Sequence, residues 1–219
     1  RYMRDAESMN FSPKELAGDT IEQFYFTVDQ DRKFELLRRL LQRENPRQAI
    51  VFCRTKKGTD RLATKLARRA RGISCIHGDL NQGMRDRVMS EFRAGKVQIL
   101  IATDVVGRGI DVSGVSHIIN YDMPTFCDDY IHRVGRTGRM GKEGIAEGVA
   151  YTFVTPEEGN ELTKVEMRIN KLLVRDEISD FEPVRKKQEE TDTPDEPAKP
   201  PPPQIKKGGR PKRRIRRAL

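Results

Sequence analysis

The sequence predicts an open α/β fold, in which helices cover both faces of a parallel β-sheet. Short runs that are mostly apolar recur between residues 21 and 154, and such runs are typical of strands buried on both faces. Amphipathic helical spacing fills the stretches between them. Polar and glycine-rich segments follow the runs, at the strand ends where sheets of this kind carry functional loops.

The apolar runs define the strands in chain order. They predict strands at Ile21–Val28, Ala49–Cys53, Ile73–His77, Val97–Ala102, His117–Tyr121 and Gly148–Val154. Each run is short and contains β-branched or aromatic residues, which favours a strand over a buried helix.

Three helices are predicted between the strands, because apolar residues recur there at spacings of three and four. They are Asp31–Glu44, Thr59–Arg71 and Gln82–Arg93. A last helix, Glu157–Leu173, is expected to pack alongside and close the domain.

Charge and proline content divide the chain. Of the net charge of +9, residues 1–175 carry +6 and residues 176–205 carry −5, whereas residues 206–219 hold eight bases and no acid. Eight of the 12 prolines lie at or beyond Pro183. We therefore expect the core within 21–175, then an acidic, proline-rich linker at 176–205 and a basic tail at 206–219, both disordered. Residues 1–20 read as the end of a segment that continues upstream.

The three cysteines predict neither a disulfide nor a metal site. Cys53, Cys75 and Cys127 are widely spaced and form no CxxC pair, and the three histidines are their only candidate co-ligands. A reduced intracellular protein is the expectation. No signal peptide and no apolar stretch of about 18 residues is present, so no membrane association is expected.

The strongest single signal is YIHRVGRTGR at residues 130–139. Arg133, Arg136 and Arg139 recur at every third position, with Gly135 and Gly138 between them. Arginine binds phosphate oxygens through paired hydrogen bonds, and glycine allows close backbone approach to an anion. The alternative is a helix with a basic solvated face, which each glycine would destabilise by about 1 kcal/mol relative to alanine. We predict a phosphate-facing turn.

The second signal is ATDVVGRGID at residues 102–111, which follows an apolar strand. Its carboxylates suit a ribose hydroxyl, and its arginine, threonine hydroxyl and backbone amides suit a phosphodiester. A plain polar loop is the alternative. Its expected place at a strand end next to the arginine cluster favours a binding site.

Two weaker segments accompany these signals, IVFCRTKKGTD at 50–60 and HGDLNQGMRDRVMSEFRAGK at 77–96. Gln82 and Arg85 share one helical face near a helix amino end, which suits contact with backbone phosphates. A helix cap or a solvated helix would explain either segment equally well. No Walker A sequence GxxxxGK[ST] occurs, so the chain supplies no phosphate-binding loop of that kind.

Taken in order, IVFCRT, HGD with its following glutamine and arginine, ATDVVGRGID, INYDMP and YIHRVGRTGR resemble the motifs of the second, C-terminal RecA-like domain of DEAD-box RNA helicases. The resemblance runs from about Ile21 to about Val154. The opening RYMRDAE is similar to the linker that leaves the first RecA-like domain of that family. A P-loop NTPase-type, RecA-like sheet is therefore implied.

The resemblance also implies roles for individual residues. Arg136 and Arg139 match arginines that contact the γ-phosphate of ATP. Asp111 matches the carboxylate on the ATP ribose, with Gly109 beside it. His132 and Arg133 match positions that couple this cluster to an acidic motif of the N-terminal domain. The positions that face the RNA backbone are Gly78, Gln82, Arg85, Thr103 and Arg108.

The family works as a two-domain clamp that closes on ATP and RNA. The implied function is thus the C-terminal half of an ATP-dependent RNA helicase, in which ATP binding and hydrolysis drive duplex unwinding. The N-terminal RecA-like domain would hold ATP and Mg²⁺, so this chain alone should be inactive. No oligomer is implied. A DNA helicase of another branch and a non-enzymatic RNA-binding module are the alternatives.

The basic tail and the cellular location follow from composition. Residues 206–219 contain no aromatic residue, so we expect a sequence-indifferent RNA tether that acts through phosphate attraction. A nuclear-localisation signal or a ribosome-contacting tail fits the same composition. A cytoplasmic location is expected, with a nuclear one left open by the tail.

Overall fold

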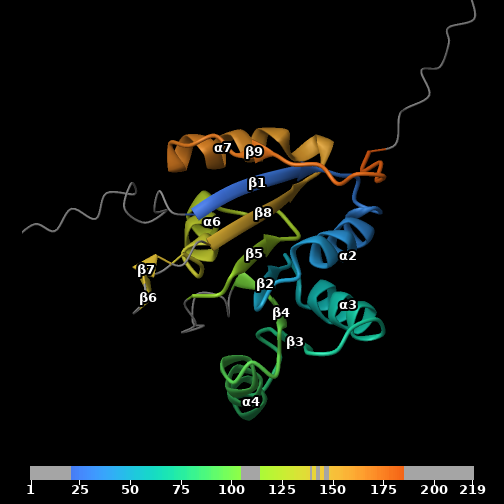
Figure 1. Cartoon of the computed structure of the whole chain (residues 1–219), viewed down its shortest axis with the longest axis vertical. Coiled ribbons are helices and arrows are strands. Elements are labelled where there is room, and N and C mark those ends of the chain that lie inside the picture. Colours follow the sequence, from blue (N-terminus) through green and yellow to red (C-terminus); the bar gives the residue numbers. More distant parts are fainter. Residues whose placement is uncertain (1–20, 105–113, 139, 142–143, 146–147, 185–219) are drawn as a thin grey trace, which may run out of the picture. The chain divides into compact units, whose positions relative to one another are not determined.

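A parallel sheet of seven strands organises the protein (Figure 1). The computed structural model describes residues 21–104, 114–138, 140–141, 144–145 and 148–184. The strand order is β3-β4-β2-β5-β8-β1-β9, and each pairing is parallel. The strands are β1 Ile21–Thr27, β2 Ala49–Phe52, β3 Ile73–Ile76, β4 Ile99–Ala102, β5 His117–Asn120, β8 Gly148–Val154 and β9 Val174–Arg175. A separate antiparallel pair joins β6 Met140–Gly141 to β7 Gly144–Ile145.

The helices lie between the strands, as predicted, with one addition. They are α2 Lys33–Glu44, α3 Lys56–Ala67, α4 Gln82–Arg93, α6 Cys127–Val134 and α7 Gly159–Ile169. The sequence predicted α3 too far along the chain, because the Thr55 side chain caps it by accepting a hydrogen bond from the Gly58 amide at 3.0 Å. No helix in the described part of the chain is long and apolar enough to cross a membrane.

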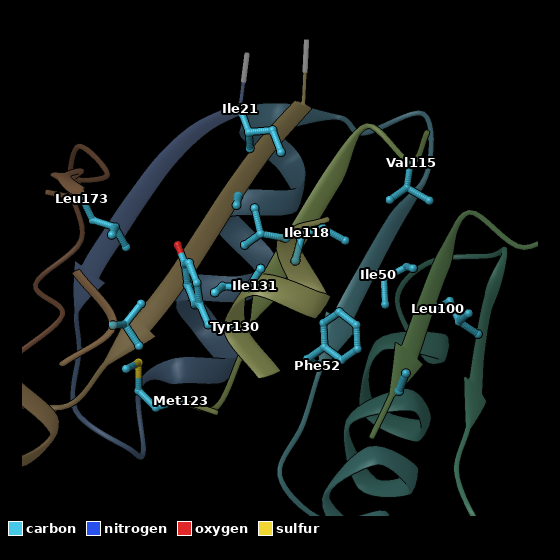
Figure 2. Packing of buried hydrophobic residues seen from close by; sticks show 14 of the residues in the cluster. Ile21, Ile50, Phe52, Leu100, Val115, Ile118, Met123, Tyr130, Ile131 and Leu173 are labelled. Carbon is cyan, nitrogen blue, oxygen red and sulfur yellow. The ribbon is translucent and has the colours of Figure 1, made fainter. Parts of the chain in front are cut away.

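Two hydrophobic clusters, one on each face of the sheet, confirm the predicted layers. Alternate strand residues point to opposite faces, so Ile50 and Phe52 join one cluster while Ala49 and Val51 join the other. Helices α4, α6 and α7 cover the first face and α2 and α3 the second. Figure 2 shows the first cluster, where Tyr130 and Ile131 of α6 lie against Ile118 and neighbouring strand residues.

All strands run in the same direction, so their carboxyl ends line up along one side of the sheet and their amino ends along the opposite side. We call these two sides the carboxyl edge and the amino edge. Short α6 connects them. It begins just after β5 at the carboxyl edge, and the turn that follows it reaches the amino edge, where Val115 and Thr137 form a bridge. Eight helical residues span about 12 Å, comparable with the length of these short strands.

Residues 176–184, the C-terminal strap, pack along α2. Arg43 binds Asp176, Arg39 donates a hydrogen bond to the Asp180 carbonyl at 3.0 Å, and Phe181 is buried. The Pro183 carbonyl accepts a hydrogen bond from the Asp29 amide at 2.9 Å. The folded part thus extends beyond the boundary expected at residue 175. The predicted segments 1–20 and 206–219, and the linker beyond residue 184, lie outside the described residues.

Candidate functional site

The segment between β3 and α4 brings three predicted RNA-facing residues together at the carboxyl edge. Asn81 caps α4 by accepting a hydrogen bond from the Met84 amide at 2.9 Å, so the helix begins at Gln82. One turn later, Arg85 Nη2 donates to the Gly78 carbonyl at 3.0 Å. Gln82 Nε2 donates to Asp86 Oδ1 at 2.8 Å. The glycine carbonyl therefore orients the arginine beside the amino end of the helix.

Several buried polar atoms have no hydrogen-bond partner within the described part of the chain, and two of them belong to predicted RNA-facing residues at this edge. They are Arg85 Nε and Thr103 Oγ1, and both are buried. Thr103 follows β4, and its amide donates to the Ile76 carbonyl of β3 at 3.4 Å. Buried polar groups without partners are uncommon in folded proteins, so both atoms mark this edge as a place where a polar ligand is expected.

Arg133 of α6 is buried and forms contacts inside the domain. Its side chain is 2% exposed, and it grips Asp104 through two hydrogen bonds, Nε to Oδ1 at 2.6 Å and Nη2 to Oδ2 at 2.8 Å. Nη1 donates to Asn120 Oδ1 at 3.1 Å and to the Asp122 carbonyl at 2.9 Å. The guanidinium also lies over the Phe52 ring, 5.0 Å from its centroid. Arg133 thus fixes α6 to the ends of β4 and β5.

The described part of YIHRVGRTGR, residues 130–138, is the end of a helix followed by a turn. Residues 130–134 belong to α6, so the prediction of a turn holds only from Gly135 onward. The carbonyl of Arg136 accepts a hydrogen bond from the Gly114 amide at 3.0 Å, before β5 begins. Arg136 therefore lies at the amino edge, and the expectation that the arginine cluster shares the carboxyl edge with Thr103 is wrong for this residue.

Gly138 is explained by packing as well as by backbone conformation. Its φ is +67°, and a Cβ there would lie 2.5 Å from Ile21 Cγ1. Sequence reasoning assigned the glycine to anion approach, but the close neighbour is an apolar side chain of β1. His132 of α6 is exposed. Four predicted site residues lie outside the described residues: Arg108, Gly109, Asp111 and Arg139.

A buried lysine at the carboxyl edge was not anticipated. Lys33 Nζ lies 3.6 Å from Asp122 and 3.7 Å from Glu158, and its side chain is 1% exposed. Arg54 joins the same two acids through its amide and its guanidinium. These contacts tie together the ends of β1, β2, β5 and β8. The charged Lys33 breaks the apolar pattern of α2, so no periodicity could reveal its burial.

The thiols occupy different environments. Burial is the main cause that raises the pKa of the Cys53 thiol to about 12. The pKa of the Cys75 thiol is raised to about 11, mainly by burial and secondly by its hydrogen bond to Asp60. Asp60 also contacts His77, so the fold assembles an acid, a thiol and an imidazole that the spacing of cysteines and histidines alone did not indicate.

Sequence comparison finds similarity to helicases. The helicase conserved C-terminal domain family matches residues 32–141. The DEAD-box ATP-dependent RNA helicase CshA of Geobacillus kaustophilus is 43% identical over 175 residues, which cover 80% of this chain and 37% of the relative. CshA of Listeria monocytogenes is 46% identical over 166 residues, 76% of this chain and 31% of the relative. The chain thus spans about a third of the length of these curated relatives.

Solved structures show the same similarity. The C-terminal domain of the DEAD-box protein Dbp5 has a TM-score of 0.66 at 36% identity, covering 72% of this chain and 90% of that one. E. coli SrmB, bound to the regulator RraA, has a TM-score of 0.69 at 33% identity, covering 77% and 98%. S. cerevisiae Dbp5 bound to RNA and ADP BeF3 has a TM-score of 0.67 at 34% identity, covering 74% and 44%.

Proposed function

Because this chain belongs to the helicase conserved C-terminal domain family, as the C-terminal RecA-like domain of a DEAD-box RNA helicase, we propose that it supplies arginines to ATP held by a preceding RecA-like domain and grips the RNA backbone. One observation carries the proposal. Arg136 and the RNA-facing residues lie on opposite edges of the sheet, and α6 links the two edges.

The carboxyl edge suits a phosphodiester. Arg85 and Gln82 offer charged and neutral donors, and the first-turn amides of α4 add the partial positive charge of a helix amino end. The unpartnered Nε of Arg85 and Oγ1 of Thr103 fit the same ligand. None of these groups recognises a base, so we expect little sequence preference. Arg108, which lies outside the described residues, is proposed to contact the same RNA backbone.

The amino edge suits developing charge on the γ-phosphoryl group. Arg136 and Arg139 would stabilise that charge, and an arginine supplied in this way is worth about 10³–10⁵ in rate. Asp111 and Gly109 would hold the ribose. The preceding domain would hold Mg²⁺ and the phosphates, so the 219-residue chain alone should show no appreciable ATP hydrolysis.

Helix α6 would couple the two edges. Arg133 binds Asp104, which directly follows Thr103, and Arg136 lies just beyond the end of the same helix. A displacement of Thr103 when RNA binds would therefore be transmitted through α6 to Arg136. Exposed His132 is free to contact the preceding domain, whereas Arg133 would act from inside this one.

The test is kinetic and uses the full-length protein. Arg136→Ala should lower kcat by about 10³ with little change in RNA affinity. Arg85→Ala should weaken RNA binding roughly tenfold while kcat at saturating RNA stays near the wild-type value. Arg87→Ala is the matched control, because Arg87 lies on α4 but is exposed and paired with Glu91. Identical kinetic profiles for the first two variants would refute the division between edges.

The basic tail is proposed as an RNA tether. If all eight charges engage single-stranded RNA, they contribute about −5 to −6 to the log–log salt slope of binding. Deleting residues 206–219 should flatten that slope for every RNA sequence and leave the melting temperature unchanged. A lower melting temperature, or loss of binding to one RNA only, would refute this role.

Imaging of the tagged full-length protein tests the proposed cytoplasmic location.

A further inference from the structure

We propose that Asp60, Cys75 and His77 form a binding site for a zinc-type divalent metal ion. One ligand atom from each residue lies within 4.8 Å of the other two. The site lies between α3 and β3, on the face of the sheet opposite α4, α6 and α7. It involves no residue proposed above to bind ATP or RNA.

The local fold explains why these three side chains meet. Cys75 and His77 are two residues apart on an extended segment, so they point to the same face of the sheet. Helix α3 covers that face, and Asp60 lies on its second turn. The His77 ring is held in place by burial, since the residue is 4% exposed. Two of the three ligands are therefore positioned by the core.

The side chains of Cys75 and His77 both form hydrogen bonds with the same carboxylate oxygen of Asp60. His77 Nε2 lies 2.9 Å from Asp60 Oδ1, and Cys75 Sγ donates to the same oxygen at 3.5 Å. A tetrahedral ion with bonds of about 2.0–2.3 Å holds its ligand atoms roughly 3.4 Å apart. The Cys75–Asp60 separation already matches this distance, the His77–Asp60 pair would move apart by about 0.5 Å, and the Cys75–His77 pair lies within 4.8 Å. On metal binding the thiol proton would leave to solvent, and the imidazole proton would move from Nε2 to Nδ1. The bound ligands are then a thiolate, a neutral imidazole and a carboxylate.

The donor set selects the metal. Thiolate and imidazole favour Zn²⁺ over Mg²⁺, which prefers oxygen ligands and keeps its waters. The Mg²⁺ that accompanies ATP should therefore not compete. With three protein ligands, and with Asp60 55% exposed in its side chain, a fourth position stays open to water. The site should thus be reachable from solvent.

The surroundings limit the affinity. His77 Nδ1 is buried and has no hydrogen-bond partner within the described residues. A metal-bound histidine ordinarily donates that proton to an acceptor, and loss of such a partner weakens metal binding by about 10–100-fold. We therefore expect a dissociation constant in the micromolar range, weaker than that of structural zinc sites.

The test is metal titration of the purified 219-residue chain, in excess Mg²⁺, by calorimetry. Wild type should bind one equivalent of Zn²⁺. Cys75→Ser and Asp60→Asn should each weaken binding at least tenfold. Cys127→Ser is the matched control, because Cys127 is another partly buried free thiol, and it should bind as wild type does. Circular dichroism checks that each variant is folded before titration.

Two further readouts identify the ligand set. Co²⁺ should produce a thiolate charge-transfer absorption with wild type and Cys127→Ser but not with Cys75→Ser. Zn²⁺ should raise the melting temperature of the first two proteins and not of the third. Absence of stoichiometric binding to wild type, or equal binding by Cys75→Ser and Cys127→Ser, would overturn the proposal.

Discussion

Replacing Arg133 by methionine tests how much of the fold depends on one buried cation. The substitution keeps an unbranched side chain that ends near the position of Nε, and it removes all four hydrogen bonds that the guanidinium donates. Asp104 then loses its charged partner, and two acceptors at the end of β5 lose their donors. Little else changes, because the methionine can still pack against Phe52.

The magnitude follows from burial. Removing one partner of a buried ion pair costs about 3–5 kcal/mol, since the other charge is left unpaired. The Asp104 side chain is 24% exposed and can recover some hydration, which favours the lower end. The buried Asn120 oxygen adds about 1 kcal/mol. We expect the free energy of unfolding to fall by about 3–4 kcal/mol, and the melting temperature by roughly 6–15 °C.

Denaturant unfolding followed by circular dichroism measures this loss. Arg168→Met is the control, because Arg168 forms an exposed pair with Asp128 and should cost less than about 1 kcal/mol. The loss of stability for Arg133→Lys should lie between those of the other two variants, since lysine restores the charge but not the bidentate hydrogen bonding to Asp104. A loss below about 1 kcal/mol for Arg133→Met would show that Arg133 does not anchor α6.

Three other predictions use the same measurement. Gly138→Ala should destabilise the protein by about 1–3 kcal/mol, because its Cβ would clash with Ile21 at a positive φ, whereas Gly159→Ala should be neutral or stabilising because that Cβ meets nothing within 4 Å. Phe181→Ala should cost about 2–3 kcal/mol by loosening the strap, and a smaller loss than Arg168→Met would contradict its anchoring role. Hydrogen bonds from two arginines lower the pKa of Glu35 to about 2, so its stabilising effect should be present above pH 4.5 and be lost as pH falls towards 2. Solvent screening limits this effect to below about 1 kcal/mol, and a Glu35→Gln variant whose stability falls with acid as steeply as that of wild type would contradict it.

Most of the sheet was predictable because its strands are buried on both faces. A short, fully apolar run such as Ala49–Phe52 is readily assigned to a buried strand, and the capping residue Asn81 marks the start of α4. Helix α6 was missed although Cys127, Tyr130, Ile131 and Val134 recur at helical spacing. The two glycines that argued against a helix lie beyond its last residue, Val134, so they do not destabilise it. The buried arginine looks like a surface residue until its partners are known.

The sequence did not predict correctly at which end of the sheet every site residue lies. The rule that loops follow carboxyl ends placed Gly78, Gln82, Arg85 and Thr103 together at the expected edge. It failed for Arg136, because the chain crosses the sheet through α6 before it reaches the glycines. The proximity of Asp60 to Cys75 and His77 could not be predicted from sequence either, because helix α3 and strand β3 come together only through tertiary packing.

The C-terminal strap has a consequence for tethering. By running back along α2 to Asp29, it makes the chain leave the described part at the carboxyl edge. Asp29 follows β1 and Gly78 follows β3, five strands apart in the sheet, or roughly 24 Å. Effective concentration is greatest when the reach of a linker matches the distance that it has to span, so any RNA-binding segment joined after Pro183 would act on RNA at Gly78 most strongly if its linker reached roughly 24 Å.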